Sequence, residues 1–316
     1  MAEMREGRTG AAPEAVDSYV EASAGRPRIP GAATLRRSYR FMRRWPVIPV
    51  VIIAMLVVSA VFAEILAPHD PAQLHLRDQN TPPVWLEGGT FTYVMGTDDL
   101  GRDIMSRIIH GARISLIVAV VVLTAGAIIG TTLGLVSGYF GRLVDEFLMR
   151  LVDITLAIPF IFVALAVVIV FGQSLTIIII ILILFSWNAF ARQVRAETLQ
   201  LKTLDYVALS RISGASAWRI MFKHILPGVS STLLVVTSLR VGQLILAESV
   251  LSFLGVGIPP PTPAWGVMIA DGRDQLGSAW WIAFFPGMAI FLTVLAFNFL
   301  GDWMRDRFDP TLRQMD

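Results

Sequence analysis

The sequence predicts an all-α integral membrane protein with six transmembrane helices. First, 55% of the 316 residues are hydrophobic and only 16% are charged, whereas a soluble domain carries about 25% charged residues. Second, the hydrophobic residues gather in runs of about 20, the length that a helix needs to cross a bilayer. Third, the Lys and Arg residues concentrate in segments that an even number of crossings would place on one side of the membrane.

The first 44 residues differ from the rest of the chain. Residues 1–44 are rich in Gly, Ala, Pro, Glu and Arg and show no apolar period, so we expect a disordered, basic, cytoplasmic N-terminus. The apolar run 45–67 starts too late and is too long for a signal peptide. We therefore expect an uncleaved first transmembrane helix, held at its cytoplasmic start by an arginine cluster. The cluster consists of Arg36, Arg37, Arg40, Arg43 and Arg44.

Five further apolar runs predict a permeation core over 112–303, followed by a cytoplasmic tail, 304–316. The β-branched run TIIIIILILF at 176–185 would favour a strand in water. In lipid a helix is favoured, because the backbone must satisfy its own hydrogen bonds. The five predicted spans are 112–136, 147–171, 174–193, 229–254 and 280–303.

The charges between the spans predict that both termini are cytoplasmic. The loop 194–228 is basic and the tail holds three Arg, whereas 68–111 and the outer cap 255–279 are acidic or mixed and are expected outside. The basic residues at the inner side are Arg192, Arg195, Lys202, Arg211, Arg219, Lys223, Arg305, Arg307 and Arg313. At the inner end of the third span, a snorkelling charged rim is expected from Asp145, Glu146, Arg150 and Asp153.

The outer segment 68–111 is expected to contain an amphipathic helix that leads into the second span. Thr97 is a good N-cap, and Asp98 and Asp99 would lie in the first turn, where the helix dipole favours them. The stretch DDLGRD lacks the spacing and the closing Glu of a calcium loop. Because Cys is absent and the four His are scattered, we predict no metal site and no catalytic residue.

The stretch ALSRISGASAWRIMFKHILPG at 208–228 predicts a helix–glycine–helix elbow. Gly214 suits the left-handed position that ends a helix, and Ser216 is a good N-cap for the next. Pro227 is expected to end that second helix before the fifth span. Four apolar residues lie at the spacing of one helix face, namely Trp218, Met221, Phe222 and Ile225. These features alone also fit a helix lying flat on the inner leaflet.

The elbow resembles the cytoplasmic signature loop of ABC importer permeases, in which a glycine is followed after nine residues by His-Ile-Leu-Pro. Other stretches are similar to the permease subunits of the dipeptide, oligopeptide and nickel class (DppC/OppC-like). They are LAPHDP (66–71), GTDDLGRDIMSRIIHGARISL (96–116), ESVLSFLGVGIPPPTPAWGVMIADGR (248–273) and FPGMAIFLTVLAFNFLGDWMRDRFDPTLR (285–313). The resemblance covers the chain from about residue 36 onward and implies the type I ABC importer transmembrane fold.

This resemblance implies a permease subunit that forms half of an ATP-driven, alternating-access pathway for di- or oligopeptides in the cell membrane. The implied partners are a homologous second permease in a heterodimer, two ATP-binding subunits or one fused pair, and an extracytoplasmic substrate-binding (lipo)protein, with no nucleic acid. Neither Lys202 nor Lys223 stands in the Gly-Lys-Ser/Thr context of a phosphate-binding loop. We therefore expect no cofactor and no enzyme activity in this chain, with ATP and Mg²⁺ on the partner ATPases.

In the family the elbow is a coupling helix that docks into a cleft of the ATPase. The family loop begins with Glu-Ala-Ala, whereas this chain has Ala208, Leu209 and Ser210, so the family's acidic contact is missing and Asp205 is a candidate replacement. The residues that the resemblance implies for coupling are Asp205, Tyr206, Arg211, Gly214, Ala215, Ser216, Trp218, Arg219 and Phe222.

The fifth span contains ionisable residues, which cost about 2.5–3.5 kcal/mol each at a helix centre. Arg240, Gln243 and Glu248 are expected to lie near one face and to point to a cavity or a partner helix. With Ser252 they form the candidate translocation pathway, and the alternative is a structural pairing with a neighbouring helix or the second permease. In the outer cap, the candidate contacts to the binding protein are Trp265, Asp271 and Arg273.

Other functions stay open at this point. Nickel-chelate or haem import uses closely similar subunits, which this chain cannot separate from peptide import. An ion-coupled secondary transporter would need intramembrane carboxylates, but Glu248, Asp153 and Glu64 lie near span ends and no inverted repeat is evident. A membrane-embedded enzyme would need a nucleophile–base pair or a metal cluster, which the sequence does not offer.

Overall fold

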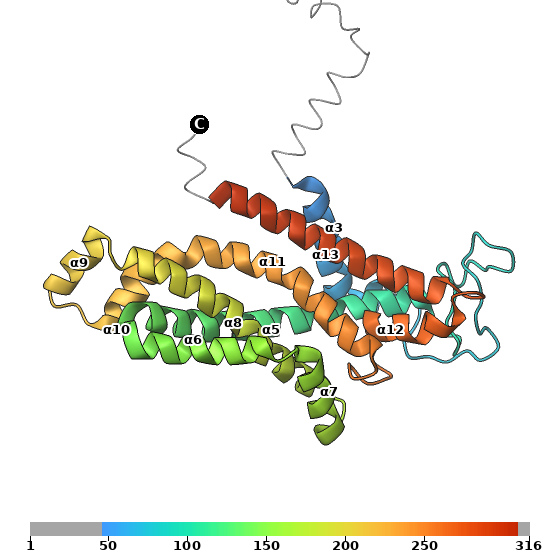
Figure 1. The fold of residues 1–316 in the computed structure, drawn as a ribbon. Coiled ribbons are helices and arrows are strands. Elements are labelled where there is room, and N and C mark those ends of the chain that lie inside the picture. Colours follow the sequence, from blue (N-terminus) through green and yellow to red (C-terminus); the bar gives the residue numbers. More distant parts are fainter. Residues whose placement is uncertain (1–45, 309–316) are drawn as a thin grey trace, which may run out of the picture. The chain divides into compact units, whose positions relative to one another are not determined.

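The computed structural model describes residues 46–308, which are helical apart from the connecting loops (Figure 1). Residues 1–45 and 309–316 lie outside the description, and with them the predicted N-terminal tail, its arginine cluster and Arg313. Among the described residues no strand forms, and one isolated β-bridge joins Thr97 to Asp103. The predicted all-α class is therefore confirmed.

The helices follow one another along the described chain without any sheet between them. In order they are α3 (Val47–Val61), α4 (Ala63–Leu66), α5 (Ile104–Phe140), α6 (Arg142–Ala157), α7 (Phe160–Phe171), α8 (Leu175–Leu201), α9 (Asp205–Ile212), α10 (Ala217–Arg219), the π-helix Ile220–Ile225, α11 (Leu226–Phe253), α12 (Trp265–Gly272), the 3₁₀ turn Arg273–Gln275 and α13 (Trp281–Phe308).

Within residues 46–308, four helices are long and apolar enough to cross a bilayer, and they contain α5, α8, α11 and α13. A fifth crossing is present if the bent pair α6 and α7 counts as one span. The first predicted span contains only a 15-residue helix, α3, which is followed by α4 after a break at Phe62. Membrane-spanning helices are thus confirmed, whereas the count of six stays a prediction.

The third predicted span, 147–171, is broken into α6 and α7, whose axes differ by 78°. Ile158 has an extended backbone, and Pro159 caps α7. Proline has no N–H to continue a helix, and its ring disfavours the helical conformation for the residue before it. The prediction of one continuous helix was wrong for this physical reason.

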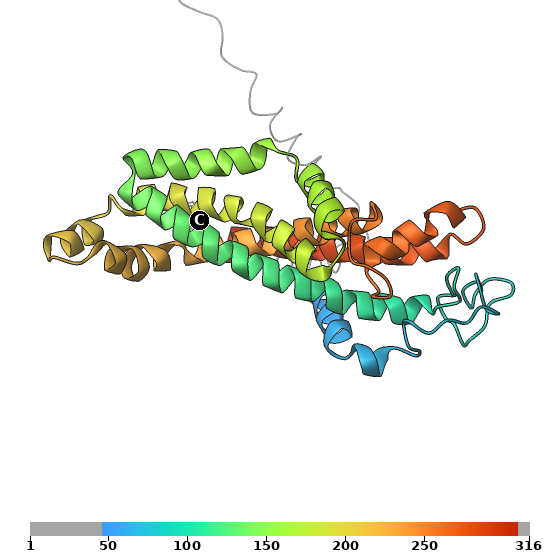
Figure 2. The same ribbon diagram turned by 90° about the horizontal axis from the view of Figure 1, so that it is seen from below.

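Helices α5 and α8 lie alongside each other and make the most extensive contact between described helices (Figures 1 and 2). Four glycines of α5 face α8 at four-residue spacing, namely Gly126, Gly130, Gly134 and Gly138. A Cβ atom on Gly130 would lie 2.3 Å from the carbonyl oxygen of Trp187. Small residues let membrane helices approach closely, and van der Waals packing then holds them where lipid offers no hydrophobic drive.

Helix α11 lies between two partners. It contacts α13 along one side and α5 and α8 along the other. One close approach to α13 is at Gly242, where a Cβ atom would lie 3.3 Å from the carbonyl oxygen of Val294. This places the middle of α11, with Arg240 and Gln243, between the α5–α8 pair and α13.

We expect Gly130→Ala to destabilise the described unit by about 1–3 kcal/mol, because the added carbon must push two backbones apart. Gly277→Ala is the matched control, since no described atom lies within 4 Å of a Cβ built at Gly277. Thermal unfolding of the detergent-solubilised protein measures the difference. Equal melting temperatures for the two variants would show that the close approach is not required.

Candidate functional site

The elbow forms as a helix–glycine–helix unit between α8 and α11. Gly214 has a left-handed backbone (φ +81°), and no described atom lies within 4 Å of a Cβ built there. The Ser216 hydroxyl accepts a hydrogen bond from the Arg219 backbone N–H at 3.4 Å. The predicted roles of Gly214 and Ser216 in the backbone are confirmed.

The π-helix changes how the elbow continues. Its i→i+5 turns lead directly into α11, so that residues 217–253 form one continuous helical path. Pro227 lies in the first turn of α11, directly after the π-helix, and the helical path continues through it. The prediction that Pro227 ends the elbow helix was therefore wrong.

The predicted apolar face of the elbow divides into two surfaces. Ile220, Met221 and Ile225 are fully buried against the ends of α5, α8 and α11 that adjoin the elbow. Trp218 and Phe222 remain 58% and 43% exposed, and their rings stack with centroids 5.9 Å apart. The exposed pair is therefore available to another molecule, while the buried residues hold the elbow in place.

Three polar contacts are made within the elbow or between its surroundings and the end of α5. The Lys202 ammonium donates to the Gly138 carbonyl at 2.6 Å, and the Arg211 guanidinium lies over the Tyr139 ring at 5.6 Å. The Tyr206 hydroxyl donates to the His224 carbonyl at 3.4 Å. The Arg211–Tyr139 contact attaches the elbow to the end of α5, and the Tyr206–His224 contact joins its two helices.

Most of the remaining predicted coupling residues lie on the surface of the elbow. Asp205 and Arg219 are exposed and Ala215 is half-buried. Leu209 and Ile212 of α9 are apolar but exposed, and neither was predicted as a coupling residue. The signal that could have found them is an apolar side chain that the helix pattern does not place on the buried face. We call the exposed apolar residues of the elbow the coupling patch, which consists of Tyr206, Leu209, Ile212, Trp218 and Phe222.

Two of the predicted rim residues form ion pairs between α6 and α8. The Arg195 guanidinium donates to the Asp145 carboxylate at 2.6 Å, and the Arg192 guanidinium donates to Asp153 at 2.5 Å. Glu146 and Arg150 are exposed. These ion pairs hold α6 against α8, and the snorkelling role of the rim stays a prediction.

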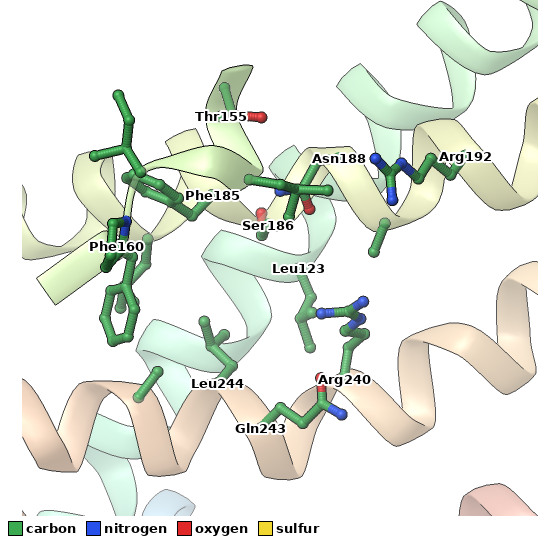
Figure 3. Close-up of a pocket in the computed structure, with 16 residues that line it drawn as sticks. Leu123, Thr155, Phe160, Phe185, Ser186, Asn188, Arg192, Arg240, Gln243 and Leu244 are labelled. Atoms are coloured by element: carbon green, nitrogen blue, oxygen red, sulfur yellow. The ribbon is translucent and has the colours of Figure 1, made fainter. Parts of the chain in front are cut away.

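A cavity of about 530 Å³ lies between α11, α8 and the break between α6 and α7 (Figure 3). Leu123 of α5 and Phe160 of α7 are among its apolar walls. Its polar lining residues are Thr155, Ser186, Asn188, Arg192, Arg240 and Gln243. Arg240 and Gln243, both predicted from the sequence, thus reach the same cavity.

The other two predicted pathway residues lie elsewhere. Glu248 is 1% exposed, and its carboxyl accepts a hydrogen bond from the Ser252 hydroxyl at 2.7 Å. Neither residue lines the cavity. A helix turns about 140° between Gln243 and Glu248 at 3.6 residues per turn. The expectation that Arg240, Gln243 and Glu248 share one face was therefore wrong for Glu248.

A second hollow of about 530 Å³ lies between α8, α11 and α13, close to the elbow. It is lined by residues of both charge signs, including Glu197 and Arg305. Among the residues that the structure describes, no group of three or more His, Asp or Glu side chains is placed to hold a metal ion.

An ionic network links the start of α5 and the loop before it to the outer cap. Asp98 is fully buried, accepts the backbone N–H groups of Leu100 and Arg102 at 2.9 Å, and pairs with the Arg102 guanidinium at 2.7 Å and with Arg107. Arg102 and Arg107 also reach Asp271 of α12, at 3.2 and 3.5 Å. The network therefore joins the loop before α5 to α12.

The same network alters the predicted start of α5. Because Asp98 caps its own loop, the helix begins six residues later, at Ile104, and Asp103 is the N-cap that accepts from the Ser106 N–H at 3.0 Å. The prediction of Thr97 as N-cap was wrong. Burial, and then the charges of Asp98 and Asp271, raise the pKa of the Asp99 carboxyl above its ordinary value.

The three candidate contacts to a binding protein differ in exposure. Trp265 is 2% exposed, and its indole N–H donates to the Ile108 carbonyl at 3.0 Å, in space that Gly111 leaves open. Its side chain holds α12 to α5 and leaves no surface for a partner in this conformation, unlike the predicted surface contact. Asp271 is partly exposed, and Arg273 is exposed.

Residues 130–314, which include the elbow and the cavity helix α11, match the family described as binding-protein-dependent transport system inner membrane component. This stretch begins inside α5 and covers three of its four α8-facing glycines.

Curated relatives match most of the chain. The dipeptide transport system permease protein DppC of Escherichia coli (strain K12) is 44% identical over 268 residues, 85% of this chain and 89% of the relative. The di/tripeptide transport system permease protein DppC of Pseudomonas aeruginosa is 41% identical over 82% and 86%. The glutathione transport system permease protein GsiD of Pectobacterium atrosepticum is 42% identical over 87% and 90%.

We expect Asp98→Asn to destabilise the outer cap by about 3–5 kcal/mol, because it leaves two buried arginines without their main counter-charge. Thermal unfolding of the purified protein in detergent measures the change. The matched control is Asp274→Asn, since Asp274 is exposed and its ion pair is with the adjacent Arg273. If both variants unfold at the wild-type temperature, the network does not stabilise the cap.

Proposed function

The chain belongs to the binding-protein-dependent transport system inner membrane component family, the permease components of ABC importers, and on that premise we propose that it imports dipeptides or other short peptides. The relatives described above are named for dipeptide, di/tripeptide and glutathione transport. All three cargoes are short peptides with free carboxylates. The shared cargo class supports the peptide proposal over nickel-chelate or haem.

The coupling patch is the proposed docking site for an ATPase subunit. Five large apolar side chains are exposed on the elbow, where lysines and arginines favour the cytoplasmic side and hence cytoplasmic termini. Exposed apolar groups on a polar segment are typical of a protein interface. ATP and Mg²⁺ would bind the ATPase, and this chain would contribute the docking surface.

The partners proposed for the complete importer are a second permease, two ATPase subunits or one fused pair, and an extracytoplasmic binding protein. Large exposed apolar side chains on α7, including Phe162 and Ile169, would face lipid or the second permease. Asp271 and Arg273 would be within reach of a binding protein at the outer cap. The cavity lined by Arg240 and Gln243 would form this chain's half of the pathway.

One observation supports the coupling mechanism most strongly. The elbow is joined to the cavity by uninterrupted helix, because the π-helix carries the chain past Pro227 into α11. A displacement of Trp218 and Phe222 by the ATPase would therefore reach Arg240 and Gln243 through the helix backbone. Closure of the ATPase pair would change access to the cavity, and hydrolysis would reset it.

Trp218→Ala is expected to weaken ATPase docking by on the order of 2 kcal/mol, about thirtyfold in affinity, because it removes an exposed aromatic anchor. The measurement is co-purification of ATPase subunits with the tagged chain, together with ATP-dependent dipeptide uptake. Gly214→Pro should have the same effect, since proline cannot adopt φ +81°.

Phe91→Ala provides the control for this experiment. Phe91 is 90% exposed and lies in the loop before α5, whereas the elbow contacts the other end of that helix. Phe91→Ala should retain the ATPases. A Trp218→Ala variant that keeps its ATPases and its uptake rate would contradict docking at the coupling patch.

A further inference from the structure

Arg240 is a cation without a counter-ion in the described part of the chain. Its side chain is half-buried near the middle of α11. Within residues 46–308 no ion pair or hydrogen bond reaches its guanidinium. A guanidinium removed from water is unfavourable unless an anion or several acceptors compensate it. The position therefore calls for an anionic group from outside the described residues.

The surrounding cavity is positive. Arg192 of α8 is the second charged group that lines it, and Figure 3 shows Arg240 and Arg192 projecting from α11 and α8 into the space between the helices. Arg192 is neutralised by Asp153, which lies outside the lining. No carboxylate is among the lining residues, and the other lining side chains are uncharged. An anion entering the cavity would thus meet Arg240 as the uncompensated charge.

The cavity has the size and the walls for a small ligand. Its volume of about 530 Å³ lies within the range of small-molecule sites, roughly 300–1,000 Å³. Gln243 follows Arg240 by about one turn and offers an amide that can pair with a peptide group. Phe160, Leu123 and Leu244 provide an apolar wall that can accept varied side chains without selecting among them.

We propose that Arg240 binds the terminal carboxylate of the peptide as it passes through the cavity, which makes this subunit selective for cargo with a free carboxylate. The inference rests on the proposed peptide import. Guanidinium and carboxylate match in charge and in their two-pronged hydrogen-bonding geometry. Gln243 and the apolar wall are uncharged and do not select for a charged group. The carboxylate is therefore the feature of the cargo that this cavity recognises.

The experiment uses the complete importer with its binding protein in proteoliposomes. ATP-dependent uptake of dialanine and of dialanine amide, which lacks the carboxylate, is measured with the binding protein preloaded and saturating. The variants are Arg240→Gln and Arg240→Lys, and the matched control is Arg305→Gln, since Arg305 lines the second hollow.

Arg240→Gln should lower the maximal uptake rate of dialanine about tenfold or more, the scale of one lost charge-assisted hydrogen bond. The KM for the loaded binding protein should not change, because outer docking is untouched. The amide rate should stay constant, so the acid-to-amide ratio falls. Arg240→Lys should recover part of the dialanine rate, and Arg305→Gln should keep the wild-type ratio.

Two results would overturn the carboxylate role without affecting peptide import. One is a wild-type dialanine rate in Arg240→Gln. The other is loss of the assembled complex in Arg240→Gln with rescue by Arg240→Lys, which would place the counter-ion on the second permease. By contrast, a wild-type importer that moves neither peptide would overturn the proposed function itself.

Discussion

The close contact between α5 and α8 is the constraint on which the other positions depend. In lipid, two apolar helices gain little from hiding their side chains, so their association depends on how many atoms they can bring into contact. The glycines of α5 allow that contact over several turns. Once α8 is set in this way, the two ends of α5 support different structures. One end carries the buried ionic network of the cap, and the other receives the Lys202 ammonium at the base of the elbow.

Charged groups inside the described chain differ in whether they have partners. Asp98 is buried but matched by two arginines and two backbone N–H groups. This arrangement holds the loop before α5 to α12, since a buried polar group with partners rigidifies its surroundings. Arg240 differs because its charge faces a cavity and has no partner among the described residues. That contrast separates a residue available to cargo from residues that maintain the structure.

The sequence was sufficient for features that depend on local chemistry or on composition. Apolar runs predicted the membrane class, and Gly214 and Ser216 predicted the turn of the elbow, because left-handed backbone and N-caps select those residue types. It was insufficient where several segments compete for one group. Asp98 bonds within its own loop and therefore does not lie in the first turn of a helix. A π-helix leads the chain into α11, so the elbow helix does not end at Pro227 as expected. The burial of Trp265 depends on Gly111, which is 154 positions away in the sequence. The four-residue spacing of the α5 glycines is present in the sequence, but we did not use it to predict the contact with α8.

Helix α11 lies close against α13 at Gly242, which would be the fulcrum if the long helix pivots. Trp218 lies about 36 Å from this point along the helix and Phe253 about 16 Å on the other side, at 1.5 Å per residue. If the helix turns as one body there, the two arms move in opposite directions, and the arm that ends at Phe253 travels about half as far as the arm that ends at the elbow. Arg240 lies beside the fulcrum and would hardly move. A shift imposed on the elbow arm would then narrow one side of the proposed pathway while widening the other, around Arg240.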